Sequence, residues 1–214
     1  MKPEVTQRQV KAALGPTIWD LGNEVLYALC RVYPGHREAG IIVAKFWLVG
    51  CSYAAANERA LVTCRNNDEF YEQSLVERIR TSHLDQWLAT FPQTVENPWS
   101  ALGQVVEVHK RLVDLLCGLT QLNKRSLASQ YLHFHRPDLF FLYDSLASKA
   151  ALSLTPPIQE IHTSGLRNAD PEYLAFTHRC QWLRDQVLRE FDMALTPRQL
   201  DNLLLRRSAK QLEQ

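Results

Sequence analysis

The chain of 214 residues lacks an excess of charge, a cysteine pair and an apolar run of membrane-spanning length. Its 24 Lys and Arg oppose 23 Asp and Glu, for a formal net charge of +1, which argues against a broadly basic surface for nucleic acid or anionic lipid. The five cysteines form no C-x-x-C pair, so we expect reduced thiols, a cytoplasmic protein and no metal site. The most apolar run, residues 41–56, is shorter than the roughly 20 residues of a membrane span and contains Lys45, so we expect a buried helix and no membrane contact.

The sequence also lacks the alternation of apolar and polar residues that is typical of strands. Long segments instead show helical spacing; in residues 100–117, for example, Leu102, Val105, Leu112 and Leu116 share one face. We therefore predict an all-α fold of about eight to ten helices. At 46% hydrophobic residues the chain has enough apolar material for one globular domain over residues 1–214. A division into two lobes around a cleft, residues 1–98 and 99–214, stays open.

Several helix ends can be predicted from local signals. Asp144 can cap a helix that runs to Leu154, because an aspartate side chain accepts from the first free amides of a helix. A long helix is expected to begin at Pro171, since proline is favoured in a first turn. Thr196 and Gln199 have the spacing of a capping box and predict the start of the last helix.

One segment carries more information than the rest. Between Gln121 and Pro137 the chain has three fixed positive charges, Lys124, Arg125 and Arg136, and no acidic residue. A helix that begins there offers backbone amides and cations to an anion such as phosphate. Asp144 follows shortly afterwards, behind an apolar and aromatic stretch.

Residues 100–154 resemble, remotely, the helix-hairpin-helix DNA glycosylase superfamily. The resemblance aligns residues 119–123 with the hairpin, Lys124 or Arg125 with the Schiff-base lysine of bifunctional members, and Asp144 with the aspartate that begins the following helix. Residues 119–123 contain no glycine where the family has a pair, and no cysteine quartet is present for an iron–sulfur cluster. No cofactor is expected.

The resemblance implies a protein that binds nucleic acid at one local site and processes a base that is rotated out of the duplex. Asp144 would stabilise the cationic sugar, and Lys124 would be the amine nucleophile. The expected nucleic-acid contacts are Arg125, Ser126, His133, His135, Arg136 and Tyr143. Two other functions stay open, a nucleic-acid binder without catalysis and a helical protein-interaction or accessory module; the oligomeric state is also open.

Each of these residues has a plainer interpretation. Asp144 can be a helix cap alone, and Lys124 with Arg125 can be a solvated helix face. His133 and His135 form an H-x-H pair, but residues two apart on a helix point in different directions, so we expect satisfied or surface histidines. The aromatic side chains near residues 131–143 can stack on bases, although core packing is the commoner role for such rings.

Overall fold

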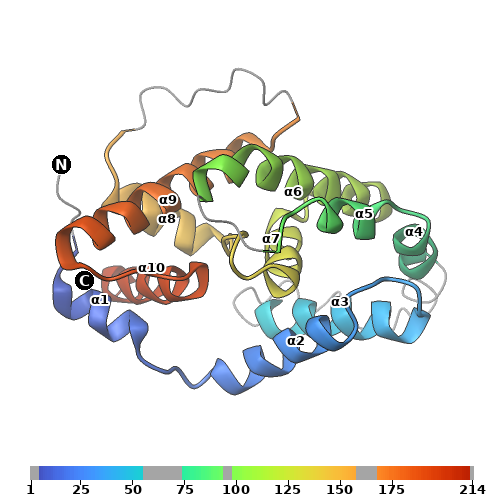
Figure 1. Cartoon of the computed structure of the whole chain (residues 1–214), viewed down its shortest axis with the longest axis horizontal. Coiled ribbons are helices and arrows are strands. Elements are labelled where there is room, and N and C mark those ends of the chain that lie inside the picture. Colours follow the sequence, from blue (N-terminus) through green and yellow to red (C-terminus); the bar gives the residue numbers. More distant parts are fainter. Residues whose placement is uncertain (1–4, 55–73, 94–97, 158–167, 213–214) are drawn as a thin grey trace.

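The protein is an all-α structure, as the sequence predicts. The computed structural model describes residues 5–54, 74–93, 98–157 and 168–212, and within these ranges it has ten helices and no strand (Figure 1). The helices are α1 (Gln7–Leu14), α2 (Asp20–Val32), α3 (Ala39–Ala54), α4 (Val76–Arg80), α5 (Leu84–Ala89), α6 (Pro98–Thr120), α7 (Arg125–His135), α8 (Ser145–Leu154), α9 (Pro171–Phe191) and α10 (Pro197–Leu212).

The helix starts follow the predicted capping signals. Asp144 caps α8 by accepting a hydrogen bond from the Ala147 amide at 2.6 Å. Thr196 and Gln199 form the predicted capping box, in which each side chain accepts from the other's backbone amide, at 2.9 and 3.2 Å. The long helix α9 does begin at Pro171, and it ends at Phe191 because Asp192 takes a left-handed conformation.

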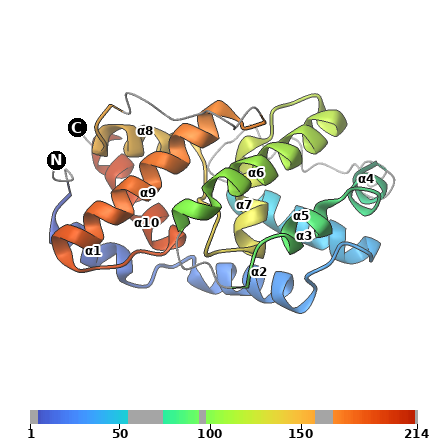
Figure 2. The ribbon, with the colours of Figure 1, turned by 45° about the horizontal axis from the view of Figure 1, so that its top comes forward.

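The main helix contacts sort the helices into two groups. α1, α8, α9 and α10 pack together, and α2 to α7 pack together, with α6 against α9 as the main contact between the groups. Figures 1 and 2 both place α1 beside α10, at the end of the molecule opposite to α4 and α5. The possible division between residues 98 and 99 does not coincide with these groups, because α1 packs with the C-terminal helices and α6 packs with the N-terminal ones.

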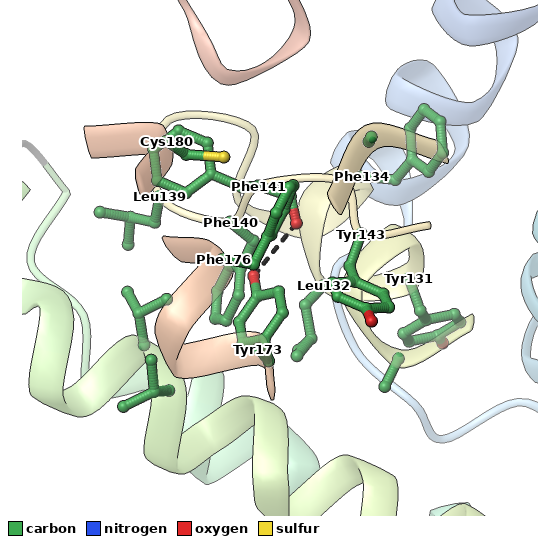
Figure 3. Close-up of a cluster of buried hydrophobic side chains, with 14 of the residues drawn as sticks. Tyr131, Leu132, Phe134, Leu139, Phe140, Phe141, Tyr143, Tyr173, Phe176 and Cys180 are labelled. Atoms are coloured by element: carbon green, nitrogen blue, oxygen red, sulfur yellow. Dashed lines mark hydrogen bonds between the residues drawn. The ribbon is translucent and has the colours of Figure 1, made fainter. Parts of the chain in front are cut away.

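One buried apolar cluster extends through both groups. Its centre is aromatic: Tyr131, Phe140 and Tyr173 are fully buried, and the Tyr173 hydroxyl donates to the Phe141 carbonyl at 3.1 Å (Figure 3). The aromatic residues of segment 131–143 are therefore core residues, which is the plainer of the two interpretations.

The apolar run around Lys45 forms α3, of which Ile42, Phe46 and Val49 are buried while Trp47 is about half exposed. The last two residues of that run, 55 and 56, lie outside the described residues. Within the described ranges, none of the helices combines the length and the apolar character that crossing a membrane requires.

Candidate functional site

The segment that resembles a helix hairpin is a hairpin of two packed helices. α6 ends at Thr120, four residues form the turn, and α7 begins at Arg125. Gln121, the first turn residue, has a φ of 56°, the left-handed conformation that glycine adopts most easily. Asn123 closes the turn by accepting from the Arg125 amide at 3.1 Å. The turn therefore forms without the paired glycines of the family.

The start of α7 has free hydrogen-bond donors. Lys124 occupies the N-cap position without a capping side-chain bond, and the first helical bond joins the Ala128 amide to the Lys124 carbonyl. The amides of Ser126 and Leu127 consequently meet no acceptor among the described residues. The half-buried Lys124 ammonium also has no ion pair within the described ranges. Two amides and one cation thus remain available to an anion.

The other two cations of the acid-free segment are neutralised by acids from elsewhere or from just beyond it. Arg125 binds Asp170 through two nitrogens, at 2.7 and 2.9 Å, and Glu172 through a third at 2.6 Å. Arg136 pairs with Asp138 at 2.8 and 3.1 Å. The predicted phosphate contacts at Arg125 and Arg136 therefore involve side chains that are already engaged within the chain.

Two more predicted contacts lie in the interior. Tyr143 is only 8% exposed and donates to Glu172 at 3.0 Å. His133 is fully buried, and its two ring nitrogens hydrogen-bond Tyr27 at 2.7 Å and the Phe140 carbonyl at 2.8 Å. These two rings therefore expose almost no surface with which they could make the predicted contact with nucleic acid.

His135 is largely covered as well. Its ring packs against His36 and Tyr131, both at 5.0 Å between ring centres, and its buried Nε2 has no hydrogen-bond partner among the described residues. Burial, with the nearby charges of Lys45 and His36, holds the pKa of His135 well below its usual value, so the ring is neutral. The H-x-H pair does not converge on one point, and the described residues contain no group of three or more potential metal ligands.

The structure brings the two ends of the candidate site together. The Arg125 guanidinium lies 5.3 Å from the centre of the Tyr143 ring, and the Ser129 hydroxyl accepts from the Tyr143 amide at 2.9 Å. These contacts fix the start of α7 beside the residue that precedes Asp144. The connection from α7 to α8 is also where the chain passes from one helix group to the other. Asp144 therefore begins α8 at the junction of the two groups, with its carboxylate partly exposed.

A second carboxyl group, missed by the sequence analysis, lies near Asp144. Asp201 of α10 is almost fully buried and accepts from Arg198 at 2.5 Å. Burial raises the pKa of Asp201 to about 7, and the negative charge of Asp144 adds to that rise. Arg198 and Asp201 are three residues apart on one helix, a spacing that fits an ion pair, but no local signal indicates that the pair is buried beside a capping aspartate from α8.

A separate polar cluster holds α5, α7 and the loop before α3 together. The His36 ring bonds Asp85 at 2.5 Å through Nδ1 and the Tyr131 hydroxyl at 2.6 Å through Nε2. Lys45, fully buried nearby, donates to the Gly35 carbonyl at 3.2 Å. Burial lowers the pKa of both His36 and Lys45. Lys45 was visible in the sequence as a charge within an apolar run, but its partners were not.

Comparison with protein-family models, with curated proteins and with solved structures found no match to this chain. The function must therefore be argued from the hairpin and from the residues at the start of α8.

Proposed function

We propose that this protein binds nucleic acid through the α6–α7 hairpin and processes a base at Asp144. One observation carries the proposal: the α7 start, with free amides and Lys124, is fastened by Arg125 and Ser129 to the connection that presents Asp144. Hairpin, helix, connection and capping aspartate follow in the order that the family resemblance implies. A phosphate at the hairpin would place the strand beside Asp144.

The chemistry assigned to this site is cleavage of a glycosidic bond. A base that leaves its sugar takes the bonding electrons with it, and positive charge develops on the sugar. One oxygen of the Asp144 carboxylate accepts a hydrogen bond from the Ala147 amide, and the other oxygen is left to face the positive charge on the sugar. Water then adds to the sugar and loses a proton, which the departed base takes up. Alternatively the Lys124 amine adds in its place, loses a proton to the base, and forms a Schiff base when the bond from that carbon to the ring oxygen breaks and the ring oxygen is protonated.

Lys124 has two alternative roles, phosphate contact or nucleophile. Arg125, the neighbouring cation that would promote a neutral amine on Lys124, already has its charge balanced by Asp170 and Glu172. The ion pairs of Arg125 with Asp170 and Glu172 therefore favour phosphate contact as the role of Lys124. Borohydride trapping on abasic-site DNA separates the two, since only an amine nucleophile leaves a covalent adduct that disappears in Lys124→Ala.

Binding is tested by the salt dependence of affinity for a duplex of about 12 base pairs. A local site in which Lys124 neutralises about one phosphate gives a slope near −1 in log K against log salt, rather than the steep slope of a broad basic face. Lys124→Ala should reduce that slope by about one, whereas Lys11→Ala, an exposed lysine of α1, should leave it unchanged. Absence of salt-dependent binding would refute the nucleic-acid role.

Catalysis is tested with Asp144→Asn, because asparagine caps a helix as well as aspartate does but carries no charge. Base release from damaged-base or mismatched duplex should fall at least about a hundredfold, while the unfolding free energy stays within about 0.5 kcal/mol. Base release that is unchanged in this variant would leave Asp144 with the role of a cap only.

A second candidate function is protein interaction, favoured by an apolar surface on α2. Leu21 and Val25 are 80% and 55% exposed, and Val32 continues the same face at 64%. Ile18 and Trp19, which precede the helix, are exposed too. Exposed apolar patches of this kind are typical of interfaces between proteins.

If this surface joins two copies of the chain, sedimentation velocity should show self-association that Leu21→Lys abolishes. Leu152→Lys changes an exposed leucine of α8 instead and should leave self-association intact.

A further inference from the structure

A pocket with both basic and apolar walls lies away from Asp144, between the α4–α5 turn and α6. Its volume is about 370 Å³, and its lining includes Arg78, Ser82, Trp87, Arg111, Asp114 and Leu115. Ligand pockets of roughly 300 Å³ and upwards hold small molecules, so this one suits a single small ligand.

The pocket contains an unbalanced positive charge. The Arg78 side chain is exposed and makes no hydrogen bond or ion pair within the described ranges. The one lining carboxylate, Asp114, is already bound by Lys110 at 2.5 and 2.6 Å. Arg111 gives one nitrogen to Glu107 at 2.6 Å and keeps its other N–H groups. Two guanidinium groups thus remain able to bind one anion, and planar guanidinium groups match phosphate oxygens in pairs.

The lining also includes apolar and aromatic side chains. Trp87 is partly buried against the core, with the Arg111 guanidinium 5.7 Å from its ring centre. The Trp87 indole N–H has no partner among the described residues, and Leu115 also lines the pocket. The Ser82 hydroxyl is used internally, donating to the Ile79 carbonyl and accepting from the Leu84 amide, so hydroxyl groups do not set the selectivity.

We infer that this pocket binds a mononucleotide unit, with its phosphate on Arg78 and Arg111 and its base against Trp87. A nucleotide combines a charged phosphate with a flat apolar ring, and the pocket presents both complements side by side. Two sources share this chemistry, a free nucleotide and one unit of a nucleic-acid strand. The position favours the strand. The Arg78 Nη2 atom lies 3.8 Å from the point that a Cβ atom on Gly118 would occupy, and Gly118 is in the last turn of α6, the helix that leads into the hairpin.

Calorimetric titration of the full chain tests the site with deoxyadenosine monophosphate, inorganic phosphate and deoxyadenosine as separate probes. The nucleotide should bind more tightly than either part alone. Arg78→Ala should weaken nucleotide binding by about tenfold or more, since charge-assisted bonds to phosphate are lost. Arg80→Ala is the matched control, because Arg80 is exposed on the same helix but does not line the pocket, and it should change binding less than about twofold.

Trp87→Phe keeps an aromatic ring but removes the indole N–H, and should weaken nucleotide binding while leaving the circular dichroism spectrum unchanged. No nucleotide binding by the wild type, or equal losses in Arg78→Ala and Arg80→Ala, would overturn the inference. A twelve-nucleotide thymidine strand identifies the source. Arg78-dependent binding that is tighter for the strand than for the nucleotide indicates a strand, and the reverse order indicates a free nucleotide.

The inference does not depend on the chemistry proposed at Asp144. Arg78→Ala and Lys124→Ala act at different places, so the failure of one site leaves the other measurable. If duplex binding responds to Lys124 but nucleotide binding is absent, the hairpin proposal stands and the pocket inference fails.

Discussion

Arg125 connects parts of the chain that are far apart in the sequence. Its guanidinium is held by Asp170, whose side chain is 4% exposed, and by the more exposed Glu172. The Arg125 guanidinium and the amide of Tyr173 keep the pKa of Asp170 below its usual value, although burial opposes them. The same side chain lies against Tyr143, so it connects α7, α9 and the approach to Asp144.

Replacing Arg125 should therefore act through stability. Arg125→Ala leaves the buried Asp170 carboxylate without its cation, and we expect the unfolding free energy to fall by about 3–5 kcal/mol. Lys110→Ala breaks the exposed Lys110–Asp114 pair and should cost less than about 1 kcal/mol. Urea unfolding of both variants measures the difference. Similar small losses in the two would show that the Arg125 pair contributes no more than a surface pair.

Lys45 is fully buried, and the hydrogen bond that its ammonium makes within the described residues goes to the Gly35 carbonyl. Burial lowers its pKa, so at pH values just below the pKa of an ordinary lysine the unfolded chain binds a proton more readily than the folded chain does. Stability from this residue therefore rises with pH, up to the pKa of an ordinary lysine.

Lys45→Met removes both the buried charge and this titration. We expect it to raise the unfolding free energy at pH 7, on the order of 1–4 kcal/mol, and to flatten the rise between pH 7 and 10. Lys149→Met, at an exposed position of α8, should change neither. Urea unfolding at several pH values gives both quantities, and a less stable Lys45→Met would show that the buried ammonium stabilises the fold.

At the scale of elements, the α6–α7 turn shows how a hairpin forms without glycine. Gln121 takes the left-handed conformation, which costs a non-glycine residue about 1–2 kcal/mol. Gln121→Gly removes that strain, and after the entropy that glycine adds to the unfolded chain we expect a gain of about 0.5–1 kcal/mol. Leu122→Gly, one residue later, relieves no left-handed strain and should destabilise instead. Thermal unfolding compares the two, and equal effects would contradict this account of the turn.

The elements were predictable because their signals are local. Apolar spacing gives the α6 stripe, and side chains within three residues set the starts of α8 and α10. The partners of Arg125 were not predictable in this way, since Asp170 and Glu172 lie more than 40 residues further along the chain. For the same reason the sequence pattern gave three cations near the candidate site, whereas the folded chain leaves Lys124 as the one without an ion pair among the described residues.

At the scale of the molecule, α1 packs on α10 and so joins the two ends of the described chain, while α8 packs on α10 and brings a second carboxyl group near Asp144. That arrangement depends on contacts between the two ends of the chain, which periodicity within a segment does not encode. It also buries ionisable groups of opposite kinds in one core, among them His109 in α6 and Asp201 in α10.

These two groups should give stability opposite dependences on pH. Burial lowers the pKa of His109 to about 3, so between pH 6.5 and 3 the unfolded chain holds a proton that the folded chain lacks, and stability falls on acidification. Burial raises the pKa of Asp201 from 3.8 to about 7, so between these values the folded chain holds the extra proton, and stability rises on acidification. Each contributes about 1.4 kcal/mol per pH unit inside its window.

Between pH 5 and 6 both windows are open, so single variants separate the two contributions. His109→Gln should lower the slope of unfolding free energy against pH by about 1 kcal/mol per pH unit, because the stability lost on acidification disappears with the ring. Asp201→Asn should raise the slope by about the same amount, because the opposing contribution is removed. Urea unfolding at pH 5.0, 5.5 and 6.0 measures the slopes. Slopes that move in the same direction in the two variants would contradict the assignment of a neutral histidine and a protonated aspartic acid to the folded core.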